Sequence, residues 1–153
     1  MNIQLTQKES ALLKDMKGQE ELCIKKYEGY ADKAKAPSLV ALFRSIAETE
    51  REHLKTVTQM MGGTVTPVDG CALSANNENC VAYSYANQED RGLDAFLCQD
   101  MLATEKHVSS MYDTSVFEFG DPVARRVLNH IQAEEQQHGE QLYAFMKANN
   151  MYQ

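Results

Sequence analysis

The sequence predicts an all-α fold, an up-down-down-up four-helix bundle with one long crossover between the second and third helices. Four long segments carry apolar residues at helical spacing. The connections between these segments are short, long and short in that order, and the second half of the chain repeats the first. A long crossover lets two consecutive helices run parallel, so this order of connections gives the up-down-down-up topology.

Each predicted helix carries a start or stop signal. The four segments run over about residues 6–35, 38–61, 87–119 and 121–149. Gly62 and Gly63 end the second segment, because glycine readily adopts the conformation that terminates a helix. Asp121 and Pro122 open the fourth segment as an N-cap followed by a proline at the first helical position.

The lengths of the connections indicate how the helices are joined. Those at Ala36-Pro37 and at Gly120 are only a few residues long, whereas the crossover, residues 62–86, is too long for a tight turn. Two short loops around one long crossover is the connectivity of ferritin-like bundles. We therefore expect a single ferritin-like domain over residues 1–153, made of two helical hairpins at about 6–61 and 87–149.

An internal repeat supports this organisation. Shifting the sequence by 85 positions, the distance from Glu20 to Glu105, aligns two whole helices without a gap. The shift pairs Leu12 with Leu97, Asp15 with Asp100, Met16 with Met101, Tyr27 with Tyr112, Pro37 with Pro122, Ile46 with Ile131, Glu50 with Glu135 and His53 with His138. The chain is thus two copies of one helical hairpin.

Each predicted helix has one apolar stripe, and every stripe is interrupted at one level by a carboxylate. On the second helix the stripe reads Leu39, Phe43, Ile46, Glu50, His53, Val57 and Met60, and the fourth helix repeats it. Glutamate and histidine three positions apart project from one face of a helix. The interrupting residues on the four helices are Glu20, Glu50, His53, Glu105, Glu135 and His138.

Charge balance points to a two-metal site at this level. Four buried carboxylates would repel one another strongly, and no lysine or arginine lies on any of the four stripes. Two divalent cations would neutralise them, with the two imidazoles completing the ligand set. One glutamate from each of two helices and a Glu-x-x-His from each of the other two is the pattern of carboxylate-bridged di-iron bundles. Such ligands suit two iron ions or manganese, and zinc can also occupy the site.

The remaining polar residues of the helices are predicted to be ordinary surface or core residues. The acids that lie off the stripes are expected to be solvated, and these are Glu21, Glu48, Glu52, Glu134 and Glu140. His107 and His130 are expected at the surface. Tyr27 and Tyr112 lie two turns from Glu20 and Glu105 on the same faces. Their rings are core packing in one interpretation, and in the other their hydroxyls also donate hydrogen bonds to ligand carboxylates.

Composition excludes several classes of partner. The net charge is −7 and the basic residues form no dense run, so a nucleic-acid partner is not expected. No apolar stretch approaches the ~18 residues that span a bilayer, and the N-terminus lacks a secretory signal, so we expect a protein that is not secreted. The cysteines form no Cys-x-x-Cys pair, and Cys71 and Cys80 bracket a loop in which they could pair by oxidation. A homodimer is compatible with a bundle of this size.

Two family resemblances extend this interpretation. The runs QEELCIKKYEGYADKA, ETEREH and AEEQQHGEQLY resemble the erythrin domain of rubrerythrins. That resemblance implies iron ligation by Glu20, Glu50, His53, Glu105, Glu135 and His138. The second half, from DMLATEKHVSSMYD to its ending NNMY, resembles the Coat F family of bacterial spore coat proteins. The Coat F resemblance implies synthesis in the cytoplasm of the mother cell, a place in or near the spore coat, and other coat proteins as partners.

Two functions follow as hypotheses. The first is a di-iron oxidoreductase that reduces peroxide or dioxygen. The second is a structural spore coat component in which the metals only stabilise the bundle. Rubrerythrins carry a further carboxylate on the third helix, but Leu102 and Val108 stand three residues either side of Glu105, which favours the structural alternative. Iron storage in a cage is a weaker third hypothesis, because cage-forming subunits usually carry a fifth short helix.

Overall fold

The computed structural model describes residues 1–69 and 80–152, and it confirms the all-α prediction of four helices. The helices are α1 (Gln7–Lys33), α2 (Pro37–Met61), α3 (Gln88–Val116) and α4 (Pro122–Ala148). Within the described ranges there is no β-strand, only an isolated bridge between Asn2 and Thr64. None of the helices there is long and apolar enough to cross a membrane.

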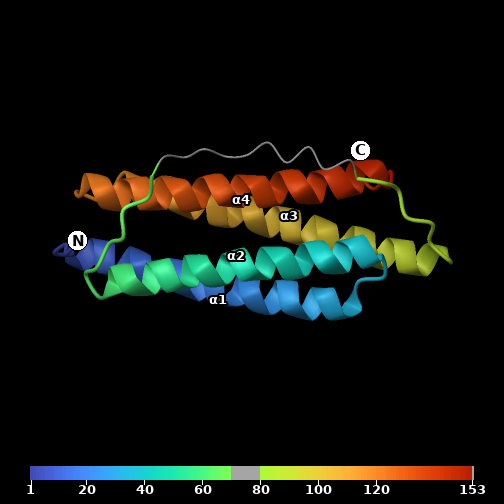
Figure 1. Cartoon of the computed structure of the whole chain (residues 1–153), viewed down its shortest axis with the longest axis horizontal. Coiled ribbons are helices and arrows are strands. Elements are labelled where there is room, and N and C mark those ends of the chain that lie inside the picture. Colours follow the sequence, from blue (N-terminus) through green and yellow to red (C-terminus); the bar gives the residue numbers. More distant parts are fainter. Residues whose placement is uncertain (70–79, 153) are drawn as a thin grey trace.

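The helices form two antiparallel hairpins that pack against each other (Figure 1). In the view of Figure 1, α1 and α4 run from left to right, and α2 and α3 run from right to left. Helix α3 contacts α1, and α4 contacts α2, so neighbouring helices around the bundle are antiparallel. The chain leaves α2 at one end of the bundle and enters α3 at the other, as a long crossover requires.

Helix α3 ends three residues earlier than the sequence predicted. The prediction ran to residue 119, because Phe119 continues the helical spacing of the apolar stripe. In the structure the last helical residue is Val116, and Phe119 is buried from the loop that follows, while Phe117 is 85% exposed. The side chain of Arg125 donates to the carbonyl oxygens of Phe119 and Gly120 and holds this loop.

The two short loops are each held by a buried acid from the other hairpin. Asp94 of α3 accepts hydrogen bonds from the backbone N–H groups of Lys35 (2.8 Å) and Ala36 (2.9 Å), just before α2. Glu9 of α1, at the position that the repeat pairs with Asp94, accepts one from the N–H of Gly120 (3.0 Å). These acids satisfy backbone N–H groups of the loops just before α2 and α4 begin.

The predicted stripes face the core. All seven stripe residues of α2 are buried, as are those of α3 and α4. The helical spacing on α1 predicts the stripe Leu13, Met16, Glu20, Cys23, Tyr27, Tyr30 and Ala34, and only the last two of these are partly rather than fully buried. Cys23 and Cys98 are buried and form no disulfide. Cys71 lies outside the described residues, so its pairing with Cys80 stays a prediction.

Candidate metal centre

The structure brings the six predicted ligands to one level in the middle of the bundle, where none is more than 4% exposed. They fall into two groups that could each hold a metal ion. One group is Glu20, Glu50, His53 and Glu135, and the other is Glu50, Glu105, Glu135 and His138. Within each group the ligand atoms lie within 4.8 Å of one another. Glu50 and Glu135 belong to both groups, which is the arrangement that carboxylates bridging two ions require.

The Glu-x-x-His spacing on α2 and α4 places the two imidazoles against the shared carboxylates. His53 Nδ1 lies 3.1 Å from Glu50 Oε2 and 3.1 Å from Glu135 Oε1. His138 Nδ1 lies 3.2 Å from Glu50 Oε1 and 3.4 Å from Glu135 Oε2. The Nδ1 atoms therefore both face the carboxylates from opposite helices, with ring centroids 6.0 Å apart.

Several donor atoms at this level have no hydrogen-bond partner. The buried atoms without one are Glu20 Oε2, Glu50 Oε1, Glu105 Oε2, Glu135 Oε2 and His138 Nδ1. An unpaired buried polar atom costs about 1–3 kcal/mol, so a core rarely retains so many close together. Among the described residues, no lysine or arginine forms an ion pair with these four carboxylates. Oxygen and imidazole donors converging in this way fit divalent transition metals.

Two tyrosines hold the carboxylates that are not shared. The Tyr112 hydroxyl donates to Glu20 Oε1 at 2.5 Å, and the Tyr27 hydroxyl donates to Glu105 Oε1. Both rings are fully buried, so core packing and the hydrogen bond occur together. Each bond joins one hairpin to the other, and the repeat relates the two bonds. The tyrosines fix the orientation of Glu20 and Glu105, because the remaining oxygen of each carboxylate is the unpaired one.

The pKa shifts in the metal-free protein divide the four carboxylates into two kinds. Burial, with the carboxylates of Glu50 and Glu135 close by, raises the pKa of Glu20 well above its usual value, and burial beside Glu135 does the same for Glu105. Burial also opposes ionisation of Glu50 and Glu135, but hydrogen bonds from the neighbouring acids and histidines outweigh it and lower the pKa of both.

The histidines balance the two ionised carboxylates. Burial alone would lower the pKa of His53, but hydrogen bonds to Glu134, Glu135 and Glu50 raise it well above the usual value. Burial is likewise outweighed at His138, where the carboxylates of Glu105, Glu135 and Glu50, all within 3.5 Å of Nδ1, raise the pKa. The raised pKa values of both imidazoles and of two of the acids favour bound protons at this level, which offset part of the charge of the four carboxylates.

Glu134 is a site residue that the sequence prediction missed. It was expected to be solvated, but its side chain is only 28% exposed and Oε2 lies 2.6 Å from His53 Nε2. This bond lowers the pKa of Glu134. A carboxylate on the outer nitrogen of a ligand histidine fixes the tautomer and the orientation of the ring. The repeat contains a signal for this residue, because the position equivalent to Glu134 is Thr49, which has no carboxylate. An acid at only one of two equivalent positions beside the candidate ligands marks a difference between the two halves.

His130 extends this contact towards the surface. Its Nε2 lies 3.4 Å from Glu134 Oε1, and its side chain is 31% exposed, so the expected surface histidine is in fact half-buried beside the site. The other acids predicted to be solvated, Glu21, Glu48, Glu52 and Glu140, are exposed, as is His107. Those predictions are confirmed.

Comparison with known proteins gives one family match. Residues 93–153 match the model of the Coat F domain. The matched part contains almost all of α3 and the whole of α4, with Glu105, Glu134, Glu135 and His138. No curated protein and no solved structure matches the chain.

Removing the Glu134 carboxylate tests its contact with His53. Glu134→Ala leaves His53 Nε2 without its partner, so we expect metal affinity at the group of Glu20, Glu50, His53 and Glu135 to fall by about 10- to 100-fold. Competition titration with Co²⁺ and a chelator measures the two affinities. Glu140→Ala, an exposed acid on the same helix, is the control and should change neither. Equal affinities in wild type and Glu134→Ala would show that Glu134 does not support the ligand.

Metal binding should release protons. Because the pKa values of Glu20, Glu105, His53 and His138 are all raised, metal ions would compete with protons for these groups. We expect protons to be released on binding, and the apparent affinity to rise with pH. Calorimetry in buffers of different ionisation enthalpy measures the release. A value below about one proton per chain would contradict this charge distribution.

Proposed function

We propose that this protein is a ferritin-like bundle that binds two metal ions, with iron as the favoured metal, and that it is associated with the bacterial spore coat. The observation that carries the proposal is the pair of ligand groups that share Glu50 and Glu135. Two ions that are each bound by four ligands, with two carboxylates in common, would form a coupled centre rather than two separate sites.

The arrangement of the helices supports the ferritin-like part of the proposal. Two antiparallel hairpins joined by a long crossover, with ligands projecting inward from all four helices, is the architecture of the carboxylate-bridged di-iron proteins. Here α1 and α3 supply Glu20 and Glu105, and α2 and α4 supply the two Glu-x-x-His pairs. The repeat gives the centre its approximate two-fold symmetry.

The chemistry of the donors favours iron or manganese. Four carboxylates and two imidazoles are harder ligands than the thiolates that zinc and copper(I) sites often use. An iron pair, if bound, would supply two electrons, which together with two protons from solvent reduce one hydrogen peroxide to two waters. The chain's own contribution is to hold the carboxylates: Tyr27 and Tyr112 orient Glu105 and Glu20, and Glu134 orients His53. Burial of all six ligands keeps bulk water away from them.

The match to the Coat F domain supports the spore coat association and a structural alternative. It places half of the candidate ligands, Glu105, Glu135 and His138, in a domain type named for spore coats. In the alternative, the metals only hold the two hairpins together. Leu102 and Val108, one turn on either side of Glu105, supply no further carboxylate there, which favours this second candidate. Other coat proteins would then be the partners of the bundle surface.

Metal content tests the centre itself. Protein purified without oxygen should contain about two metal ions per chain by mass spectrometry, and a Glu50→Ala, Glu135→Ala variant should contain almost none, because both ions lose two ligands. The control is Glu52→Ala, Glu140→Ala, which removes two exposed acids from the same two helices. Metal content that is equal in the two variants would show that the shared glutamates are not ligands.

Oxidation kinetics separate the two candidate functions. If reduction of peroxide is the function, protein loaded with ferrous iron should be oxidised by peroxide much faster than free ferrous iron, as followed by absorbance in a stopped-flow instrument. If the metals are structural, oxidation should be no faster than in solution. Removing the metal should then lower the melting temperature, because an ion that binds only the folded state stabilises it.

A further inference from the structure

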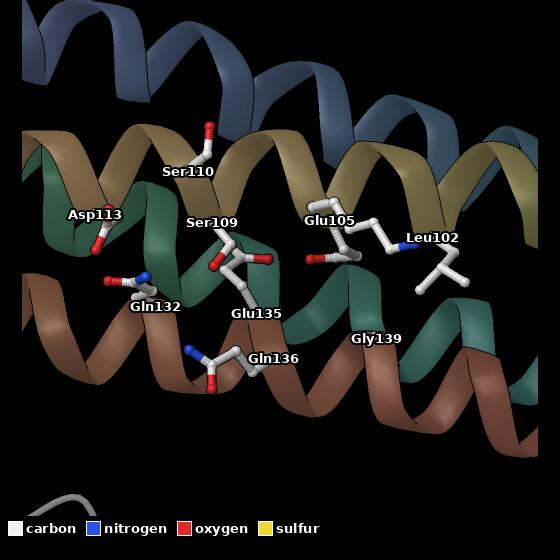
Figure 2. Close-up of a pocket in the computed structure, with 10 residues that line it drawn as sticks. Leu102, Glu105, Ser109, Ser110, Asp113, Gln132, Glu135, Gln136 and Gly139 are labelled. Carbon is white, nitrogen blue, oxygen red and sulfur yellow. The ribbon is translucent and has the colours of Figure 1, made fainter.

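A groove between α3 and α4 leads from the surface to the candidate metal centre (Figure 2). It has a volume of about 450 Å³, and both Glu105 and Glu135 are part of its lining. Figure 2 shows the carboxylate of Glu105 from α3 and that of Glu135 from α4 pointing towards each other between the two helices. The groove therefore reaches one shared and one unshared carboxylate of the centre.

The innermost part of the groove contains two carboxylate oxygens that have no hydrogen-bond partner. Glu105 and Glu135 are 2% and 1% exposed, and each has one oxygen without a hydrogen-bond partner. These are the innermost polar groups of the lining, since its other polar residues are half-buried or exposed. An ion that reached the floor would meet both carboxylates at once.

The walls of the groove carry apolar, polar and charged groups, among them Leu102 and the exposed Lys106. Ser109, Gln132 and Gln136 contribute hydroxyl and amide groups, and the exposed Asp113 contributes a carboxylate near Gln132 (Figure 2). Hydroxyl and amide oxygens can replace water around a divalent cation. Leu102 lines the groove on the α3 side and Gly139 lines it on the α4 side. Because glycine has no side chain, the α4 side is open at this position.

The opposite face of the bundle is built differently, although the repeat relates the two. The equivalents of Ser109 and Gly139 are Ile24 and Leu54, two large apolar residues that are half-buried. The equivalent of Gln136 is Arg51, which forms ion pairs with Glu28 and Glu48. On α1 and α2 these side chains occupy the positions that correspond to the open ones between α3 and α4.

The cavity on that opposite face stops short of the centre. It is lined by Glu28, Asp32, Arg44, Ala47, Glu48 and Arg51, and neither Glu20 nor Glu50 is part of the lining. The two halves of the repeat thus carry the same ligands but differ in access to them. The cavity on one face is lined by two arginines and three acids and reaches no candidate ligand, whereas the groove on the other face reaches two candidate ligand carboxylates.

We infer that the groove between α3 and α4 is the route by which divalent cations reach the centre, an inference that rests on the proposed metal-binding function. Two properties support it together: contact with two candidate ligand carboxylates, and closure of the equivalent route on the other face. A positive charge added to the lining would repel a cation on its way to these carboxylates.

Filling the groove tests the route. The variant Ser109→Ile, Gly139→Leu copies the residues of the closed face, and a Cβ at position 139 would make only an ordinary contact, 3.6 Å from Leu102 Cδ1. The control Ser45→Ile, Gly92→Leu makes the same changes at exposed positions. Stopped-flow absorbance measures the rate of Co²⁺ uptake by metal-free protein. We expect the filled variant to bind and release Co²⁺ at least about tenfold more slowly, with an unchanged equilibrium affinity and a control like wild type.

A charge change provides a second test that does not disturb packing. Asp113→Lys places a positive charge in the lining of the groove, and Asp32→Lys makes the same change on the closed face, where Asp32 is 79% exposed. We expect only Asp113→Lys to slow Co²⁺ uptake, and high salt to restore the rate.

The outcomes separate this inference from the proposed function. Uptake as fast as wild type in the filled variant would overturn the route, and so would equal rates for Asp113→Lys and Asp32→Lys. Both results leave the metal centre intact, because equilibrium affinity is measured on the same samples. If wild-type protein binds no Co²⁺, the proposed metal-binding function is wrong, and the inferred route is wrong as well.

Discussion

Burial of four carboxylates at one level of the core is the constraint on which the rest of the structure depends. A bundle of this kind could be filled with apolar residues alone, yet every helix places a glutamate at the same level. Two tyrosines and two histidines contact these carboxylates and compensate for part of the cost of burying them. The contacts of Glu50 with His53 on α2 and of Glu135 with His138 on α4 lie within one helix, and the others join different helices, so the polar level also fixes how the helices are aligned.

The approximate two-fold symmetry accounts for the similarities between the halves, and departures from it account for the differences. Ligands, tyrosines and loop-capping acids occur in both hairpins at equivalent positions. Glu134 has no acidic equivalent, so His53 and His138 have different surroundings. Ser109 and Gly139 correspond in the repeat to the larger residues Ile24 and Leu54. Of the two equivalent faces, the one between α3 and α4 is therefore the open one. The approximate symmetry therefore leaves the two candidate ligand groups with unequal surroundings and unequal access.

Much of the fold and the centre could be predicted because helical spacing and the repeat report the same positions independently. Glu50 and His53 lie on an apolar stripe, and their equivalents 85 positions later do too. Spacing failed where a side chain acts from outside its stripe. Glu134 reaches a histidine on a neighbouring helix, and Phe119 enters the core from a loop, so neither follows the helical rule. Access to the centre could not be predicted either, because it depends on which side chains are absent between two helices.

Asp94 and Glu9 have a consequence for cooperativity. Because each acid completes the loop of the hairpin to which it does not belong, neither hairpin has all its backbone donors satisfied by itself. Opening one end of the bundle leaves backbone N–H groups of a loop without partners in one hairpin and a carboxylate without its partners in the other. Opening that end therefore costs free energy in both hairpins, which disfavours the unfolding of one hairpin alone. The hairpins should lose structure together, and ligands that come from both would be released in a single transition.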